Sequence, residues 1–250
     1  MIVRPDGSDH LLLIRQPDHS ELAGRIMATW RAEKFPERPT RDRVLRATAL
    51  HDIGWITGLE GGDDLPRVNP ETGVPFGFVD APLSVRQGVW SRAIDRLIAK
   101  DQEDQGDHYV GALVAQHALT VYRRFSGDPD WKPFFRDMER RRDDLVAPDA
   151  LPTFLLDYTI VGLGDLFSLI FCNGWREPYL MESYQAILHG DCLRIAPDPF
   201  EGATVPLDVE ARRIPARVYT SDADLRAALT EAPIVRLSGT AAGAPLPSIS

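Results

Sequence analysis

The chain has 250 residues, of which 44% are hydrophobic and 26% are charged, as is ordinary for a soluble globular protein. This length fits one large domain, or one domain with a small appendage. The formal net charge of −9 argues against a general nucleic-acid binder, so we expect no partner among nucleic-acid duplexes.

The cysteines and the apolar stretches indicate the cellular compartment of the protein. Cys172 and Cys192 are the only cysteines, too few for a disulfide framework, and this usage fits a reducing cytoplasm. No signal peptide is visible, and the longest apolar stretch, Tyr158 to Cys172, is too short and too polar to span a bilayer. We therefore expect a cytoplasmic protein that has no membrane partner.

Apolar residues at helical spacing predict six helices, which follow a short N-terminal strand region at residues 1–16. The first helix begins after Pro17, and Thr40 can cap the second, which Gly54 is expected to end. The last helix is hydrophobic nearly all round and should be central in the fold. The predicted helices cover residues 18–33, 41–53, 83–100, 108–125, 131–146 and 152–172.

Residues 55–82 form the longest stretch with no regular pattern, and they are rich in glycine and proline. A loop of this length in a compact domain is usually functional or disordered. Its aromatic residues Trp55, Phe76 and Phe78 argue against disorder. We therefore expect this loop to close one wall of a binding pocket.

From Asn173 onward the segments become short, and proline and glycine become frequent. Residues 222–231 predict a short helix, and the tail 238–250 is expected to be disordered. The sequence thus predicts a mainly α protein, in which five to six helices in residues 1–172 carry a β-rich C-terminal appendage of residues 173–250 that could pair with the N-terminal strand. The predicted strands of this appendage are residues 192–195, 203–205, 216–219 and 234–237.

The adjacent pair His51-Asp52 is the strongest indication of a site, because it lies where an apolar helix is expected to end. Adjacent side chains on a helix point about 100° apart and rarely serve one packing surface. A carboxylate at the negative end of a helix is electrostatically unfavourable unless a cation lies nearby. The pair therefore predicts a metal site.

Further candidate ligands, His19, His117 and Asp165, lie on three other predicted helices. Asp165 needs a partner such as a metal ion, because an unpaired carboxylate in so apolar a helix is costly. Asp157 stays open as an alternative ligand, or as the group that orients a ligand histidine. Mixed imidazole and carboxylate ligands suit Mn, Fe, Ni, Co or Zn better than Ca.

The remaining histidines are left out of the predicted site. His108 lies on the opposite side of its helix from His117, so the two cannot easily serve one site. His10 and His189 lie in polar or loop contexts and are expected to be incidental.

The order His, His-Asp, His, Asp resembles the HD-domain superfamily of metal-dependent phosphohydrolases. Five motifs spread over nearly the whole chain resemble more closely the bacterial family called domain of unknown function 3891. One departure from many HD enzymes is that Ile53-Gly54-Trp55 follows the pair, where those enzymes carry further histidines, lysine or arginine. The five motifs are Gln16-Pro17-Asp18-His19, His51-Asp52-Ile53-Gly54-Trp55, Asn69-Pro70-Glu71-Thr72-Gly73-Val74-Pro75, Gln116-His117 and Asp165-Leu166-Phe167-Ser168-Leu169.

The resemblance implies an HD-like helical bundle that holds one or two divalent ions. It implies that His19, His51, Asp52 and Asp165 are metal ligands, and that His117 binds a second metal or the substrate phosphate.

On this basis we predict a metal-dependent hydrolase of a small anionic substrate, a phosphate ester or a nucleotide, with Asp52 and His117 as catalytic residues. Arg86 and Arg92 could reach such a substrate or could be solvated surface. A di-iron protein that activates oxygen and a non-catalytic HD-like ligand-binding module stay open as alternatives. A homodimer is also left open.

Overall fold

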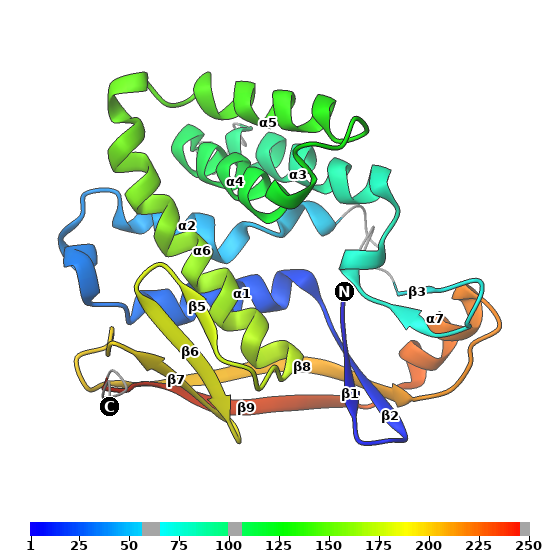
Figure 1. Cartoon of the computed structure of the whole chain (residues 1–250). Coiled ribbons are helices and arrows are strands. Elements are labelled where there is room, and N and C mark those ends of the chain that lie inside the picture. The colour runs from blue at the N-terminus through cyan, green and yellow to red at the C-terminus, as the bar shows by residue number, and fades with distance from the viewer. Residues whose placement is uncertain (57–65, 100–106, 246–250) are drawn as a thin grey trace.

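The computed structural model describes residues 1–56, 66–99 and 107–245, and the six predicted helices are all present (Figure 1). Their apolar faces explain why they form, since each buries its periodic residues against a neighbour. A seventh helix near the C-terminus was also predicted. The helices are α1 (Gln16–Ala28), α2 (Arg41–Leu50), α3 (Leu83–Ile98), α4 (His108–Val121), α5 (Lys132–Asp143), α6 (Leu151–Asn173) and α7 (Asp222–Glu231).

The strands overturn the predicted fold class. Seven of them form one curled, mixed sheet in the order β1-β2-β8-β9-β7-β6-β5, in which only β7 and β9 are parallel. The prediction of a mainly α, HD-like helical bundle with a β-rich appendage is therefore wrong. The strands of this sheet are β1 (Ile2–Asp6), β2 (His10–Ile14), β5 (Tyr179–Met181), β6 (Tyr184–His189), β7 (Cys192–Ala196), β8 (Thr204–Pro215) and β9 (Ile234–Gly243).

The sheet joins the two ends of the chain. The N-terminal hairpin β1–β2 pairs with β8, so strands from residues 1–16 and from beyond residue 173 share one hydrogen-bonded layer. Residues 238–243, which were expected to be disordered, belong to β9 and pair with β7 and β8. The predicted strand 216–219 is not formed, while β8 is longer than predicted. The division of the chain at residue 172 stays a prediction.

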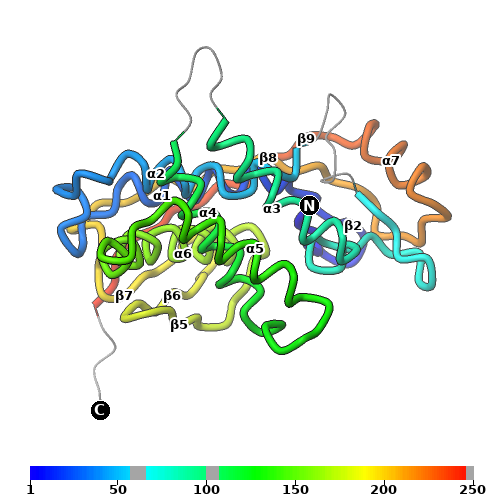
Figure 2. Tube along the Cα trace, turned by 90° about the horizontal axis from the view of Figure 1, so that it is seen from above, coloured from blue at the N-terminus to red at the C-terminus, as the bar shows by residue number. Residues whose placement is uncertain are grey.

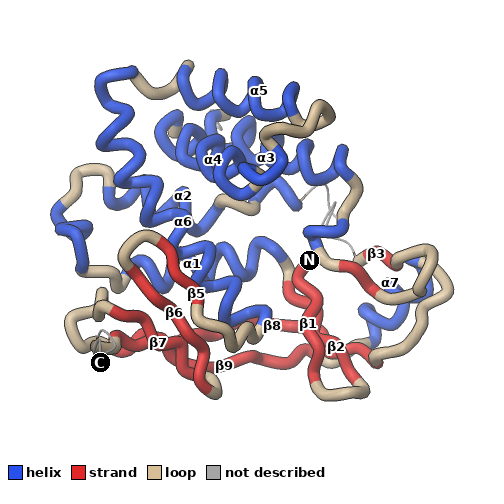
Figure 3. The backbone as a smooth tube through the Cα atoms, in the orientation of Figure 1, coloured by secondary structure: helices blue, strands red, loops and turns tan. Residues whose placement is uncertain are grey.

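The helices stack on one face of this sheet (Figures 1 and 3). Helices α1 and α6 lie directly on it, where α1 contacts β8 and α6 contacts β1, β6 and β7. Helix α2 packs on α1 and α6, and α4 then joins α2 to α3 and α5. Seen from above, α7 lies at the opposite end of the molecule from β5, β6 and β7 (Figure 2). A separate two-stranded sheet, β3 (Arg67–Val68) and β4 (Pro75–Phe76), lies near α7.

Close packing at a glycine draws three helices together. A Cβ atom on Gly164 of α6 would lie 2.7 Å from Thr48 Cγ2 of α2 and 2.8 Å from Met27 Cγ of α1. Only glycine allows this approach without displacing a neighbour. Because Asp165 is the next residue, the contact sets the position of its carboxylate relative to α1 and α2.

Helix α6, extended by the 3-10 turn η6 (Pro148–Ala150), is long and apolar enough to cross a membrane by length and composition alone. Within its most apolar window, however, 67% of the residues are buried inside the fold. This burial is typical of the core helix of a soluble protein, and it agrees with the central place that the sequence predicts for the helix. The cytoplasmic location stays a prediction.

Candidate metal centre

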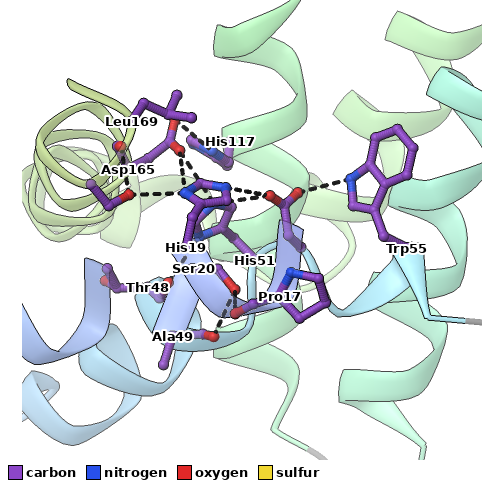
Figure 4. A network of polar contacts seen from close by, with 12 residues as sticks. Pro17, His19, Ser20, Thr48, Ala49, His51, Trp55, His117, Asp165 and Leu169 are labelled. Carbon is purple, nitrogen blue, oxygen red and sulfur yellow. Dashed lines mark hydrogen bonds and ion pairs between the residues drawn. The ribbon is translucent and has the colours of Figure 1, made fainter. Parts of the chain in front are cut away.

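Four helices and the turn after α2 bring the five predicted site residues together, and Figure 4 shows four of them, His19, His51, His117 and Asp165, grouped together. His19 lies in the first turn of α1, His51 caps the C-terminus of α2, and Asp52 begins the 3-10 turn η2 (Ile53–Trp55). His117 comes from α4 and Asp165 from α6. All three histidine rings are nearly fully buried.

The two carboxylates lie within reach of the histidine ring nitrogens. Asp52 Oδ2 is 2.7 Å from His19 Nε2 and 3.6 Å from His51 Nε2. Asp165 Oδ1 is 3.3 Å from His51 Nε2, and Asp165 Oδ2 is 3.5 Å from His117 Nε2. The ligand atoms of His19, His51 and Asp165 all lie within 4.8 Å of one another. His117 lies at the edge of this cluster, where its Nε2 atom faces the carboxylate of Asp165.

The hydrogen bonds of His51 fix its tautomer. Its Nδ1 is 2.8 Å from the carbonyl oxygen of Thr48 and must therefore donate a proton to it. In neutral imidazole the other nitrogen, Nε2, then carries a lone pair, and it faces the two carboxylates. Within residues 1–56, 66–99 and 107–245, the buried His51 Nε2 has no hydrogen-bond partner. A cation or a proton bound at this atom would remove the repulsion between its lone pair and the carboxylate oxygens.

The hydrogen bonds of Ser168 fix the tautomer of His19 in the same way. The Ser168 hydroxyl donates its single proton to the backbone carbonyl of Asp165 at 2.9 Å, so it accepts a hydrogen bond from His19 Nδ1, also at 2.9 Å. The lone pair of His19 Nε2 then points at Asp52 Oδ2. In their neutral forms both imidazoles thus direct a lone pair of Nε2 at carboxylate oxygens, so a proton or a metal ion between the rings and the carboxylates is favourable.

The spacing of these atoms fits one ion. Nitrogen and oxygen ligands held at about 2.1 Å from one metal lie roughly 3 to 3.4 Å apart. Separations of 2.7, 3.3 and 3.6 Å within the cluster lie near that range, while His19 and Asp165 are 4.0 Å apart and would draw closer around an ion. With neutral histidines the two aspartates leave a charge of −2, which a divalent cation balances. The donor set of His19, His51, Asp52 and Asp165 therefore fits a divalent transition metal.

The pKa values of the cluster residues also favour a bound cation. Burial lowers the pKa of His51, but the charges of Asp52 and Asp165 outweigh burial and raise that pKa to about 9. Burial would raise the pKa of Asp165, yet His117 and His51 hold it well below its usual value. The pKa of Asp52 is likewise lowered by His51 and His19 against the effect of burial. Both carboxylates are therefore ionised and attract a positive charge.

A pocket of about 190 Å³ opens above the cluster. The predicted site residues line it together with Trp55 and Phe78 of the predicted loop, whereas Phe76 does not. Arg86 lines the pocket, but Arg92 donates a hydrogen bond to the carbonyl of Gly54. The part of the loop at residues 57–65 lies outside the described residues. The pocket is further lined by Gln16, Val79, Trp90, Val121, Tyr122, Arg124 and Leu169.

Asp157, the alternative ligand, lies in a different network. Its carboxylate accepts hydrogen bonds from Arg38 at 2.9 Å, Tyr109 at 2.7 Å and Thr40. These partners tie α6 to α4 and to the segment before α2, so Asp157 has a structural role. Of the histidines left out, His108 and His189 are exposed, and His10 lies in β2.

The site contains residues that the sequence interpretation did not assign. Ser168 holds His19, Tyr158 Oη lies 3.3 Å from His117 Nδ1, and the Trp90 ring packs against His117 with centroids 5.5 Å apart. Asp52 Oδ1 accepts a hydrogen bond from the indole of Trp55 at 3.1 Å. The spacing of Ser168, one helical turn from Asp165, was the only signal that could have indicated its role.

Replacing Ser168 by alanine should weaken metal binding by about 10-fold to 100-fold, because an imidazole that loses its orienting partner is a poorer ligand. Competition with a metal-binding dye measures this affinity. Ser20→Ala is the matched control, since the buried Ser20 hydroxyl bonds only to the carbonyls of Pro17 and Ala49. An unchanged affinity in Ser168→Ala would contradict the role assigned to Ser168.

Metal binding should depend on pH, because an ion must displace the proton that His51 holds in the metal-free protein. The apparent affinity should rise roughly tenfold per pH unit up to about pH 9. The folded-state pKa of His51 lies above its ordinary value of 6.5, so this group stabilises the metal-free protein most below pH 6.5 and loses that effect as pH rises toward 9. Calorimetric titrations of Zn²⁺ between pH 6.5 and 8.5 check this, and a flat affinity would contradict it.

The fold and the site together define an α+β protein with a buried cluster of three histidines and two aspartates below a pocket. A family model described as Protein of unknown function (DUF3891) matches residues 1–216. The chain therefore belongs to this family, as its motifs indicate. No curated protein matches the chain, and no solved structure matches it.

Proposed function

We propose that this protein is a divalent metal-dependent hydrolase of a phosphate ester. The observation that carries the proposal is the buried Nε2 atom of His51, which faces carboxylates from two elements and has no hydrogen-bond partner among the residues that the structure describes. His19, His51, Asp52 and Asp165 would hold the ion, with Mn, Fe, Ni, Co or Zn preferred by this mixed set of ligands. His117 lies where it could join a second ion or contact the substrate.

A relationship to the HD-domain superfamily is part of this proposal. It is supported by the order of the residues along the chain and by their origin on α1, α2, α4 and α6. The seven-stranded sheet under these helices is a departure from a helical bundle, so the relationship is proposed for the site and the helices around it.

Each residue of the cluster can be given a chemical role. A divalent ion, when bound, lowers the pKa of a water molecule and polarises a phosphoryl oxygen. Asp52 is ionised and held by the Trp55 indole, so it can accept a proton from a water molecule in the pocket. His117 can donate a proton from Nε2 to the leaving oxygen. The indole rings of Trp55 and Trp90 line the pocket beside the cluster.

The experiment is a phosphatase assay on the full chain with Mn²⁺, Co²⁺, Ni²⁺ or Zn²⁺ added. Hydrolysis of p-nitrophenyl phosphate should require one of these ions and should stop on addition of a chelator. His117→Gln should lower kcat by about 100-fold to 10,000-fold, the range expected for loss of a general acid, while the ion held by His19, His51, Asp52 and Asp165 is retained.

The alternatives predict different results. Bound iron with a visible absorption band and no hydrolysis would favour the oxygen-activating protein. A metal-free protein, or one with bound metal and no activity on any phosphate ester, would favour the ligand-binding module. Either outcome would contradict the proposed hydrolase.

A further inference from the structure

Arg86 is an arginine beside the proposed centre. It lies in the first turn of α3, lines the same pocket as His51 and His117, and is half-buried. Its Nε atom is buried and has no hydrogen-bond partner in the described part of the chain. Among the described residues it forms no ion pair, and its guanidinium instead lies 5.4 Å from the ring centre of Trp131 and 5.8 Å from that of Phe125.

This arrangement favours an external anion. A partly buried charge without a counter-ion is unfavourable, and contact with aromatic faces offsets only part of that cost. The rings also hold the planar guanidinium in place, which lowers the entropy lost when it binds a ligand. Guanidinium groups form paired hydrogen bonds with phosphate oxygens, so phosphate is a fitting ligand.

Arg124 provides a second positive charge at the same pocket. It lies in the 3-10 turn η5 (Arg123–Phe125) and its guanidinium is 4.7 Å from the ring centre of Phe125. Phe125 in turn stacks on Trp131, with ring centroids 4.8 Å apart. One aromatic cluster between α4 and α5 thus holds both arginines at the pocket that contains the five site residues.

Resting on the proposed function, we infer that Arg86 and Arg124 bind the dianionic phosphate of a monoester whose alcohol part is apolar. The charges of the described pocket residues support a dianion: Asp52 and Asp165 balance a divalent ion, and the two arginines then leave a charge of +2. A phosphate monoester carries about two negative charges near neutral pH, as phosphorylated side chains do, whereas a diester carries one.

The walls of the pocket indicate the alcohol part of the substrate. Val79 is 50% exposed and Val121 is 38% exposed, and both line the pocket. Phe78 and Leu169 line it as well. Apolar side chains left in contact with solvent at a pocket commonly mark the surface that a ligand covers. An apolar or aromatic alcohol would bury them, whereas a sugar or an inorganic leaving group would not.

Binding of phenylphosphonate and methylphosphonate to the metal-loaded full chain tests both parts of the inference. Both probes carry the same dianionic head and have no ester bond that could be cleaved. Calorimetry should show that phenylphosphonate binds about tenfold more tightly, because its ring is buried against the apolar wall. Arg86→Met should weaken both probes tenfold or more, and Arg124→Met should weaken them several-fold.

Arg123→Met is the matched control, because Arg123 is exposed, adjacent to Arg124 and does not line the pocket. It should change both affinities less than twofold. Unchanged binding in Arg86→Met, or in Arg124→Met if the first variant does not fold, would overturn the arginine site. Equal affinities for the two probes would overturn the apolar alcohol. Elemental analysis of each sample separates these outcomes from failure of the proposed function. If the proposed function alone fails, the protein holds no metal, but Arg86→Met still weakens phosphonate binding.

Discussion

Replacing Asp165 by asparagine should lower metal affinity by at least about 1,000-fold, so that the variant is purified without metal and without phosphatase activity. The carboxylate oxygens of Asp165 lie near all three histidine rings, at 3.3 Å from His51 Nε2, 3.5 Å from His117 Nε2 and 4.0 Å from His19 Nδ1. The asparagine amide has no charge with which to balance the ion. It also replaces one carboxylate oxygen with an NH2 group, which donates hydrogen bonds and does not bind a cation. Elemental analysis together with dye competition measures the loss.

Asp157→Asn is the matched control for this experiment. Asp157 is a buried carboxylate on the same helix, but its partners are Arg38, Thr40 and Tyr109. This variant should lose stability, because a buried ion pair loses one charge, and should keep its metal. Retention of metal in Asp165→Asn would contradict the assignment of that residue as a ligand. Loss of metal in both variants would show that the effect comes from disturbing α6.

Replacing Gly54 by alanine should destabilise the protein by about 3 kcal/mol or more, at or above the upper part of the usual range for overpacking. A Cβ atom at this position would lie 1.8 Å from the carbonyl oxygen of Val89 and 2.9 Å from the backbone nitrogen of Ala93. Both atoms belong to the backbone of α3, which cannot turn away as a side chain can. The helix would have to move, and it carries Arg86 and Trp90 of the pocket.

Gly127→Ala is the control, since a Cβ atom there meets no other atom within 4 Å. It should change the free energy of unfolding by less than about 0.5 kcal/mol, as do most exposed substitutions. Chemical denaturation of the two variants measures the difference. A Gly54→Ala variant as stable as the unchanged protein would contradict the close packing of η2 against α3.

The helices could be predicted because their apolar residues recur at the helical period over ten or more residues. The sheet could not be assembled in the same way, because its strands are short or interrupted. Strand β8 does alternate, with Val205, Leu207, Val209 and Ala211 buried, but the predicted strand was ended at residue 205, before Pro206. This proline is tolerated because β8 pairs there with β9, while β2 pairs with β8 further along, at residues 212–215. Pairing between the two ends of the chain is not encoded locally.

The candidate site was more accessible to sequence reasoning than the fold. Histidine and aspartate on separate amphipathic helices are few enough to be grouped, and all five come together in the structure. Their role as ligands stays a prediction. Gly54 was interpreted as a helix end, but α2 ends at Leu50 and the glycine is needed for the approach of α3. The spacing of Ser168 from Asp165 hints at its role, whereas the role of Arg124 depends on contacts between distant segments that no spacing reveals.

The proposed function depends on a divalent transition metal held by His19, His51, Asp52 and Asp165. Elemental analysis of the full chain, purified without chelators, measures this metal. We expect close to one ion of Mn, Fe, Ni, Co or Zn per chain, or two if His117 helps to hold a second, and loss of that metal in Asp165→Asn. A protein that contains no metal, and that binds none of these ions when they are supplied at micromolar concentration, would contradict it.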